Sequence, residues 1–399
     1  MTSLLRFLTL TPSITFGVLR SEIFPWAFIY SIFIFSYNNI YLLYILIFGL
    51  FHAAASWFFY GHFNLFDFTV VWGSYLNIFL IYYAVLKAKE SLIVKYFKTL
   101  RWVFFLIIGV GLLQSSPVGE YADSVIKTLV PRGQGFSMGD GRGVTLLSSE
   151  PSRAAVEFLF LYAVVRFFIA EQMTKLRLAL HDMLFLFFVV FVLKSLTGII
   201  CSVIFLAACS RKYMYWFSIA GVALLAGLLS TSDRFTKTLL ILSNSESFDL
   251  AWLYFIDVSG FRVPAVLSSY YSIFDSYIGY GAGNFVTSST SALEYAGFTP
   301  DSIAYFRNRG GEFFSLRPPS FFANLILDFG IFGIGFIILF LKQTFKAATS
   351  GVYPILVIFL IVAFFSGSVG NPVPWICLAI TLRLSAQNAS RTSFIGVKH

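Results

Sequence analysis

The sequence predicts an all-α, polytopic integral membrane protein. Apolar residues make up 58% of its 399 residues, charged residues only 12%, and the mean hydropathy is +0.81. Soluble domains typically contain about 45–50% apolar and about 25% charged residues. The 49 Phe, 21 Tyr and 7 Trp exceed what a water-exposed surface could accommodate. This composition excludes a soluble protein, a disordered protein and, despite the net charge of +9, a nucleic-acid-binding protein.

Apolar runs long enough to enter a bilayer recur along the chain and predict 11 or 12 transmembrane helices within one membrane domain, residues 1–399. We expect spans at roughly 22–36, 40–60, 65–86, 102–114, 154–170, 183–193, 195–209, 214–230, 319–341, 352–366 and 373–383. Either the Arg6-bearing stretch 3–19 forms a twelfth span, which we favour, or the N-terminus lies outside. This stretch lacks a small-residue cleavage site after its apolar residues, so we expect it to be retained.

Two long polar stretches, residues 115–153 and 231–318, interrupt the spans and are rich in Gly, Ser and Pro. Together they carry a net charge of −2, whereas the rest of the chain carries +11. The short segment 87–101 has five basic residues and one acidic residue. Because basic loops stay on the cytoplasmic side, we expect 87–101 inside and both long loops outside, as large, partly helical periplasmic loops.

The topology depends on residues 183–209, which contain Lys194 within an apolar stretch. A single helix would place loop 231–318 inside, whereas two short spans that meet at Lys194 and Ser195 place both long loops outside. An unpaired lysine in the middle of a bilayer costs at least a few kcal/mol. We therefore predict two spans with a break at this position.

Cysteine and histidine usage gives no indication of a metal or redox centre. The three cysteines lie in apolar runs, and the four histidines are scattered without the spacing of a metal motif. We predict no metal site and no cofactor.

The end of the first long loop offers a basic and an acidic candidate for chemistry. A Gly-rich stretch presents Arg142, and Glu150-Pro151 follows directly before a predicted helix. Proline at the first helical position and an acid near a helix N-terminus are both favourable. Taken alone, Glu150 therefore fits a helix start better than a catalytic acid. Arg142 runs against the positive-inside bias, which favours a functional role.

The second long loop contains Arg262 and Arg317, whose guanidinium groups can bind phosphate oxygens in a bidentate manner. Its glycines at 279, 281 and 283 resemble half of a dinucleotide fingerprint, but no strand–turn–helix unit surrounds them. We expect instead a tight turn whose backbone approaches a ligand or a helix closely.

In their order, these motifs resemble the O-antigen polymerase (Wzy-type) family, which is related to the O-antigen ligases. The resemblance covers about residues 139–336 together with the topology. It is carried by Arg142 followed by SSEPSRAA, the S-x-T-G turn at Ser195–Gly198, SGFR with Arg262, the GYGAGN turn with Gly281 and Asn284, and RPPSFFANLILDFGIFGIGF with Asn324 and Asp328.

The resemblance implies a metal-independent, inverting glycosyltransferase of the membrane-embedded GT-C type, in the bacterial inner membrane with its active site facing the periplasm. It would transfer a growing glycan from undecaprenyl diphosphate to the non-reducing end of a new lipid-linked repeat unit. Its implied partners are these lipid-linked oligosaccharides, the bilayer and a chain-length regulator of the same pathway.

The predicted chemistry divides between an acid and several cations. Glu150 is the expected base, with Asp257 and Asp275 as alternatives, and Arg142 and Arg262 stabilise the departing diphosphate. The predicted substrate-binding residues are Lys194, Ser195, Arg317, Gly281, Asn284 and Asn324.

Three alternatives remain open at this stage. The ligases carry a histidine in the second outer loop, and this chain has none in either outer loop, which favours a polymerase over a ligase. A transporter or flippase of lipid-linked glycans usually contains repeated halves, and no internal symmetry is visible here. A purely structural scaffold does not explain arginines in outer loops.

Overall fold

The computed structural model describes residues 2–16, 23–34, 40–60, 63–130, 143–170, 172–209, 256, 260–349 and 351–395. Every regular element within these ranges is helical. The expected span at 214–230 and two candidate site residues, Arg142 and Asp257, lie outside the described residues.

The structure describes the following helices, in chain order. They are α1 (Thr2–Leu10), α2 (Trp26–Ile34), α3 (Ile40–Tyr60), α4 (Leu65–Lys87), α5 (Glu90–Gln114), α6 (Gly119–Leu129), α7 (Pro151–Ile169), α8 (Lys175–Phe188), the π-helix η1 (Val189–Leu193), α9 (Leu196–Cys209), α13 (Arg262–Tyr271), the 3₁₀-helix η2 (Ser272–Phe274), α14 (Phe285–Tyr295), the 3₁₀-helix η3 (Pro300–Ser302), α15 (Ala304–Arg307), α16 (Phe321–Ala347), α17 (Tyr353–Phe365) and α18 (Val373–Ile395).

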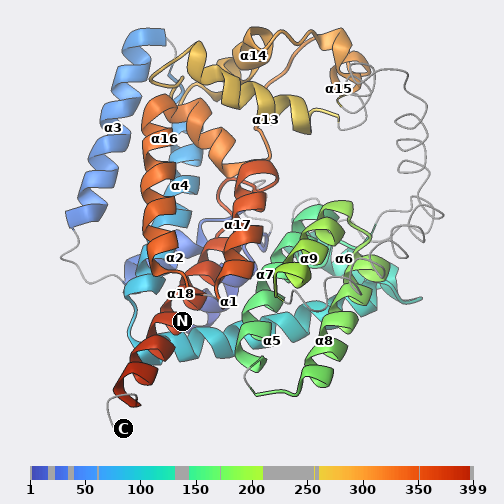
Figure 1. Ribbon diagram of the computed structural model, residues 1–399. Helices are drawn as coiled ribbons and strands as arrows, with labels where there is room; N and C mark the ends of the chain where they lie inside the picture. Colours follow the sequence, from blue (N-terminus) through green and yellow to red (C-terminus); the bar gives the residue numbers. More distant parts are fainter. Residues whose placement is uncertain are drawn as a thin grey trace.

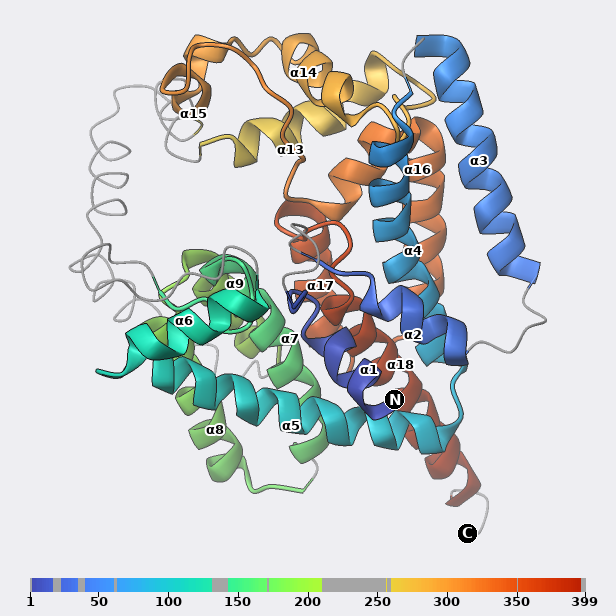
Figure 2. The same ribbon diagram turned by 180° about the vertical axis from the view of Figure 1, so that it is seen from behind.

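The helices form a bundle with a separate layer across one end. Figures 1 and 2 show α4 and α16 side by side, with α17 and α18 next to them, α6 to α9 on the other side and α5 running across the lower part from below α4 to α8. Helices α13, α14 and α15 form a layer at the upper end in both views, with α15 at the end of the layer farthest from α4 and α16. We call residues 260–318 the end layer. It is the described part of the second long loop, which is partly helical as expected.

Burial places α7 and α18 at the centre of the bundle. All residues of α7 from 154 to 165, and all of α18 from 373 to 382, are buried. Large apolar side chains are instead exposed on the outer helices, for example Phe58 (83%), Trp102 (78%) and Leu176 (82%). Apolar residues on all sides of a helix bundle are typical of a protein whose solvent is lipid.

Four described helices are long and apolar enough to cross a membrane. They are α4, α5, α16, and α8 together with η1 (Lys175–Leu193). Shorter apolar helices include α9, α17 and the first part of α18, Val373–Ala386. The chain is an all-α membrane protein, while a total of 11 or 12 spans stays a prediction.

The expected span at 3–19 is wrong as a continuous helix. Helix α1 has nine residues and ends at Leu10, and residues 11–16 are not helical. Proline disfavours the helical conformation of the residue before it, and Pro12 follows Thr11 at this position. Nine helical residues span only about 14 Å, about half of the hydrocarbon core.

The expectation of a loop at 87–101 is also wrong, because most of it belongs to α5. This part of the helix is amphipathic: Ile93, Tyr96 and Leu100 are buried, whereas Lys95 and Lys98 are exposed. The buried positions recur at the three- and four-residue spacing of a helix face. The basic residues therefore lie along the solvent-facing side of a helix that continues into the expected span 102–114.

The break between α8 and α9 lies where the sequence predicted it. The π-helix η1 ends at Lys194, which adopts a left-handed conformation with φ of 47°. Lys194 is exposed, and Ser195 is buried directly before α9. A lysine at the break thus avoids burial in the middle of one long apolar helix.

Helix α16 contains a second break, at Gly330, whose φ of 54° and ψ of −127° are not helical. A turn of the end layer binds the backbone groups beside this break. Tyr280 N donates to Leu327 O (3.0 Å), Gly281 N donates to Asp328 O (2.9 Å), and Ile331 N donates to Tyr277 O (2.8 Å). These bonds replace the intrahelical bonds that the break removes.

Substitution of Gly330 tests how much the bundle depends on this junction. A Cβ at Gly330 would lie 2.2 Å from Tyr277 O, and the positive φ adds strain. We expect Gly330→Ala to lower the free energy of unfolding in mixed micelles by about 2–4 kcal/mol. In the same helix, a Cβ at Gly335 meets nothing within 4 Å. Gly335→Ala should leave stability unchanged or raise it by up to about 1 kcal/mol, and equal losses in the two variants would contradict this account.

Candidate functional site

The structure brings together two of the predicted catalytic residues, which are 112 positions apart in the sequence. Arg262 Nη2 lies 2.8 Å from Glu150 Oε2, and each side chain is 46% exposed. Arg262 is the first residue of α13, in the end layer, and Glu150 immediately precedes α7, in the bundle. The pair therefore joins the two long loops at one end of the molecule.

Glu150 does not have the capping role that its sequence position suggested. Its backbone is extended and Pro151 begins α7, but its side chain makes no capping hydrogen bond to the helix. The carboxylate instead accepts from Arg262 and, at 3.4 Å, from Ser152 Oγ. The geometry leaves a partly exposed carboxylate whose position is set by a guanidinium rather than by the helix start.

Buried hydrogen bonds to η1 and α5 hold residues 143–149, the segment that leads to Glu150. Val144 N donates to Val192 O (3.3 Å), and Leu146 N donates to Gln114 Oε1 (2.9 Å). All residues from 143 to 149 are buried. Glu150 is thus the exposed end of a rigid segment.

Glu157, inside the bundle, accepts further hydrogen bonds that hold this segment. Ser148 Oγ donates to the Glu157 carboxylate, which also accepts from Asn371 Nδ2 at 2.9 Å. Glu157 is only 4% exposed. A buried carboxylate needs such partners, and here they connect the first loop, α7 and the start of α18.

Lys194 and Ser195 lie against the other side of the same segment. A Cβ at Gly143 would come within 1.7 Å of Leu193 O, so glycine permits the contact between the first loop and the break. Ser195 is 6% exposed, and its hydroxyl accepts from Gly198 N at 3.3 Å. The structure thus gives Ser195 a role at the start of α9, whereas Lys194 is exposed and its substrate-binding role stays a prediction.

Arg317 and Asn324 lie at the junction between the end layer and α16. Arg317 Nη1 contacts Asn324 Oδ1 (3.3 Å) and Asp328 Oδ2 (3.5 Å), and both partners are fully buried. Tyr75 OH donates to the same Asp328 oxygen at 2.7 Å. No sequence pattern points to Tyr75, because it is one aromatic residue among many in an apolar run.

The side-chain amide of Asn324 also forms hydrogen bonds within this junction. Its Nδ2 donates to Pro318 O (2.6 Å) and to Ser320 O (2.5 Å). Asn324 and Asp328 therefore hold the chain where it enters the membrane. The partly exposed Arg317 is the only member of this group that solvent reaches among the described contacts.

Gly281 and Asn284 shape the glycine turn. A Cβ at Gly281 would lie 2.2 Å from Ser56 Oγ, which confirms the expected close approach to a helix, and Asn284 Nδ2 donates to Tyr280 O at 2.8 Å. Tyr280 OH donates to Asp275, an alternative base. Burial, followed by this bond, raises the pKa of Tyr280 above its ordinary value, so the phenol remains a donor and Asp275 is the less available carboxylate.

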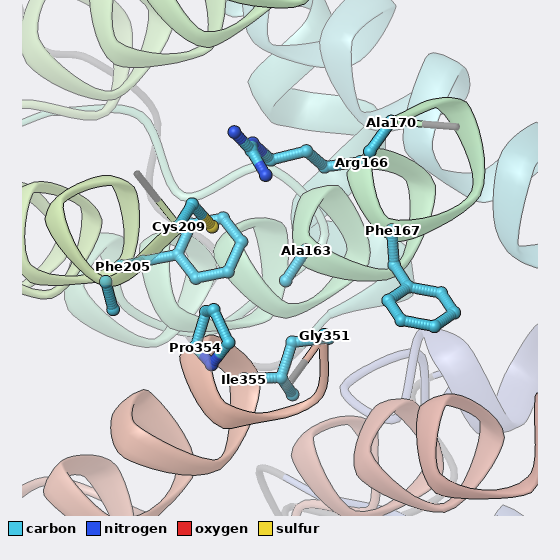
Figure 3. A pocket seen from close by; sticks show the side chains of 10 residues that line it. Ala163, Arg166, Phe167, Ala170, Phe205, Cys209, Gly351, Pro354 and Ile355 are labelled. Carbon is cyan, nitrogen blue, oxygen red and sulfur yellow. The ribbon is translucent and has the colours of Figure 1, made fainter. Parts of the chain in front are cut away.

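A second charged group lies at the opposite end of α7, beside a cavity of about 290 Å³ (Figure 3). Arg166 Nε and Nη2 contact the two carboxylate oxygens of Asp182 at 2.7 and 3.0 Å. Tyr162 OH donates to Asp182 as well. Because its charge is neutralised by a bidentate buried partner, Arg166 stabilises the packing of α7 against α8 and offers little to a ligand.

Comparisons with protein-family models, with curated proteins and with solved structures found no match. The resemblance to Wzy-type polymerases therefore stays a prediction, and the candidate site rests on the geometry of its residues.

The exposed pair Glu150–Arg262 and the buried pair Arg166–Asp182 should differ sharply in their effect on the free energy of unfolding. Exposed pairs typically contribute about 0–1 kcal/mol, so a double-mutant cycle of Glu150→Gln and Arg262→Gln should give a coupling energy below about 1 kcal/mol. Removal of one partner of a buried pair typically costs about 3–5 kcal/mol, so Asp182→Asn should destabilise the protein strongly. Free energies of unfolding in mixed micelles provide the measurement. A large coupling energy for Glu150 and Arg262 would assign that pair a structural role.

Proposed function

We propose that this chain is a membrane-embedded glycosyltransferase that polymerises a bacterial surface polysaccharide. The observation that supports the proposal is the ion pair between Glu150 and Arg262, which combines a proton acceptor and a phosphate-binding group at one exposed point. In this proposal the pair faces the periplasm of the bacterial inner membrane, the chain has 11 or 12 spans of GT-C type, and residues 115–153 and 231–318 are the periplasmic loops.

The reaction is an inverting displacement between two lipid-linked glycans. A hydroxyl at the non-reducing end of the acceptor unit attacks the anomeric carbon of the donor sugar, and its proton passes to Glu150. The bond from that carbon to the undecaprenyl diphosphate oxygen breaks, and the electron pair leaves with the diphosphate. Arg262 stabilises the charge that develops there, so that no metal ion is required in this scheme.

The resting ion pair fits these two roles because it is easily exchanged. An exposed pair gains little free energy from its contact, so a diphosphate can recruit Arg262 without a large penalty. Arg262 would then turn its planar fork toward phosphate oxygens, which frees the Glu150 carboxylate to accept a proton. Lys194, next to the same buried segment, adds a second cation, and Arg142 is a third candidate from the sequence.

Activity of substituted proteins tests the proposal directly. Glu150→Gln keeps the size of the side chain but cannot accept a proton near neutral pH, so chain extension should fall by about 100- to 10,000-fold. Arg262→Ala should lower it by roughly 30- to 1000-fold, and Arg262→Lys should restore it only in part. The assay is conversion of purified lipid-linked repeat units to longer chains in the presence of EDTA.

Matched controls come from the same end layer. Glu294 is an exposed acid on α14, and Arg309 is an exposed base that lies over the Tyr305 ring. Glu294→Gln and Arg309→Ala should extend chains at the normal rate. Normal chain extension by Glu150→Gln would show that Glu150 is not the base of the reaction. Single units that accumulate on the inner face of cells lacking this protein would favour a flippase instead.

The proposed orientation is tested by labelling of single cysteines in a protein from which Cys201, Cys209 and Cys377 have been removed. A cysteine at position 294, in the end layer, should react with an impermeant thiol reagent added from the periplasmic side. A cysteine at position 95, on the basic side of α5, should react only after the membrane is permeabilised, because basic segments stay inside. The reverse pattern would contradict the orientation.

A further inference from the structure

A second cavity lies at the opposite part of the end layer, between the beginnings of α4 and α14. Its volume is about 310 Å³, near the lower limit of typical ligand pockets. It is lined by Phe63, Asn64, Asp67, Gly283, Asn284, Val286 and Thr287. None of the groups that carry the proposed reaction lines it, so it needs an explanation of its own.

The walls of this cavity are held together by the backbone. Asn64 N donates to Gly283 O at 3.2 Å, and the Asn64 side chain accepts from Phe66 N and Asp67 N to cap α4. A Cβ at Gly283 would lie 2.8 Å from the Phe63 ring, so glycine allows this ring to pack against the turn. The cavity is therefore built into the junction of the two helices.

Two acceptors that line the cavity have no donor among the described residues. The partly exposed Asp67 side chain makes no hydrogen bond or ion pair with another residue that the structure describes, and it lies in the first turn of α4, where the helix dipole favours a carboxylate. Asn284 is 5% exposed, and its Oδ1 has no hydrogen-bond partner within the described ranges. Buried polar atoms in proteins are nearly always paired, so the unpaired Asn284 acceptor points to a missing donor, and the Asp67 carboxylate is open to the same ligand.

The chemistry of the lining restricts what that donor is. The negative charge of Asp67 repels a diphosphate, and a lipid chain would leave the carboxylate unpaired. Protein sites for a hard cation such as Ca²⁺ usually gather several carboxylates, whereas Asp67 is the one acid in this lining, and no group of three or more acidic, histidine or cysteine side chains occurs among the described residues. A sugar ring offers several hydroxyl donors to the acceptors and an apolar face to Phe63, which is 39% exposed.

We propose that this cavity is a sugar-binding subsite in which Asp67 accepts hydrogen bonds from the hydroxyl groups of one sugar residue. The assignment of that sugar to a glycan substrate rests on the proposed function. Phe63 provides the surface on which the ring lies, Thr287 borders the opening, and Asn284 fixes the turn that forms the inner wall. The subsite holds the glycan at a distance from the diphosphate and performs no chemistry.

The test measures binding without reaction. The full-length protein in detergent is mixed with glucose, galactose, mannose, N-acetylglucosamine or rhamnose at millimolar concentration, and saturation transfer from protein to sugar is recorded by NMR. We expect transfer to at least one sugar of this panel. Loss of hydrogen bonds to a charged group should weaken its affinity roughly 10-fold or more in Asp67→Asn.

A second variant and two controls separate the subsite from a general loss of structure. Thr287→Phe retains Asp67 but fills the opening of the cavity, and it should abolish transfer. Glu294→Gln, on the same helix outside the cavity, and Glu150→Gln, in the proposed reaction site, should bind sugar as the unchanged protein does.

Three results would overturn the proposal. They are no transfer to any sugar of the panel, transfer that survives both Asp67→Asn and Thr287→Phe, and stoichiometric Ca²⁺ or Mg²⁺ binding by calorimetry that Asp67→Asn removes. The proposed reaction and the proposed subsite can fail separately. If Glu150→Gln makes normal polymer while sugar binding depends on Asp67, only the proposed role of Glu150 in the reaction is rejected. If Glu150→Gln loses polymer but the unchanged protein binds no sugar of the panel, only the subsite is rejected.

Discussion

The backbone hydrogen bonds between the turn at 277–281 and the break in α16 are the interaction on which the end layer depends. A break in a helix leaves amide and carbonyl groups without their intrahelical partners, and residues 321–330 are buried, so these groups need other partners. Three bonds from the turn meet this requirement. A Cβ at Gly279 would lie 2.5 Å from Gly330 N, so only a turn without a side chain at this position reaches the break. The same constraint places the turn of the end layer against α16.

The ion pair at the other part of the layer depends on this fixed position. Helix α13 is tied to the bundle by Tyr270 OH, which donates to Phe364 O at 2.7 Å. Glu150 is held from the opposite side by the buried segment above Glu157. Two independently anchored segments thus bring their exposed ends together, and the pair itself adds little to stability. A contact of this kind can be opened by a ligand without loss of the fold.

The positions of most described apolar helices could be predicted from the sequence because apolar runs with polar ends are local features, as for residues 65–86 and 352–366. The basic part of α5 was mistaken for a loop because Lys95 and Lys98 lower its hydropathy, although Ile93, Tyr96 and Leu100 mark a helix face. Glu150 and Arg262 were each recognisable as candidates. Their pairing was not, since nothing in either segment encodes a contact with a residue 112 positions away. Asp67 could not be recognised as a site residue from the sequence, because the cavity beside it forms from two distant segments.

Charge separates the two proposed binding functions. Arg262 and Lys194 lie toward α7 and α9, where positive charge would favour a diphosphate, whereas Asp67 lies at the beginning of α4, where its charge would disfavour an anion. A lipid-linked glycan has its charge at one end and its hydroxyl groups along the rest, so opposite signs at two fixed points allow only one orientation of such a molecule. A substrate held in this way would present its diphosphate to Arg262 and its sugar chain to Asp67. In this proposal the hydrogen bonds at the α16 break serve substrate orientation, because a substrate bound at both Arg262 and Asp67 is oriented only if the distance between these residues stays constant.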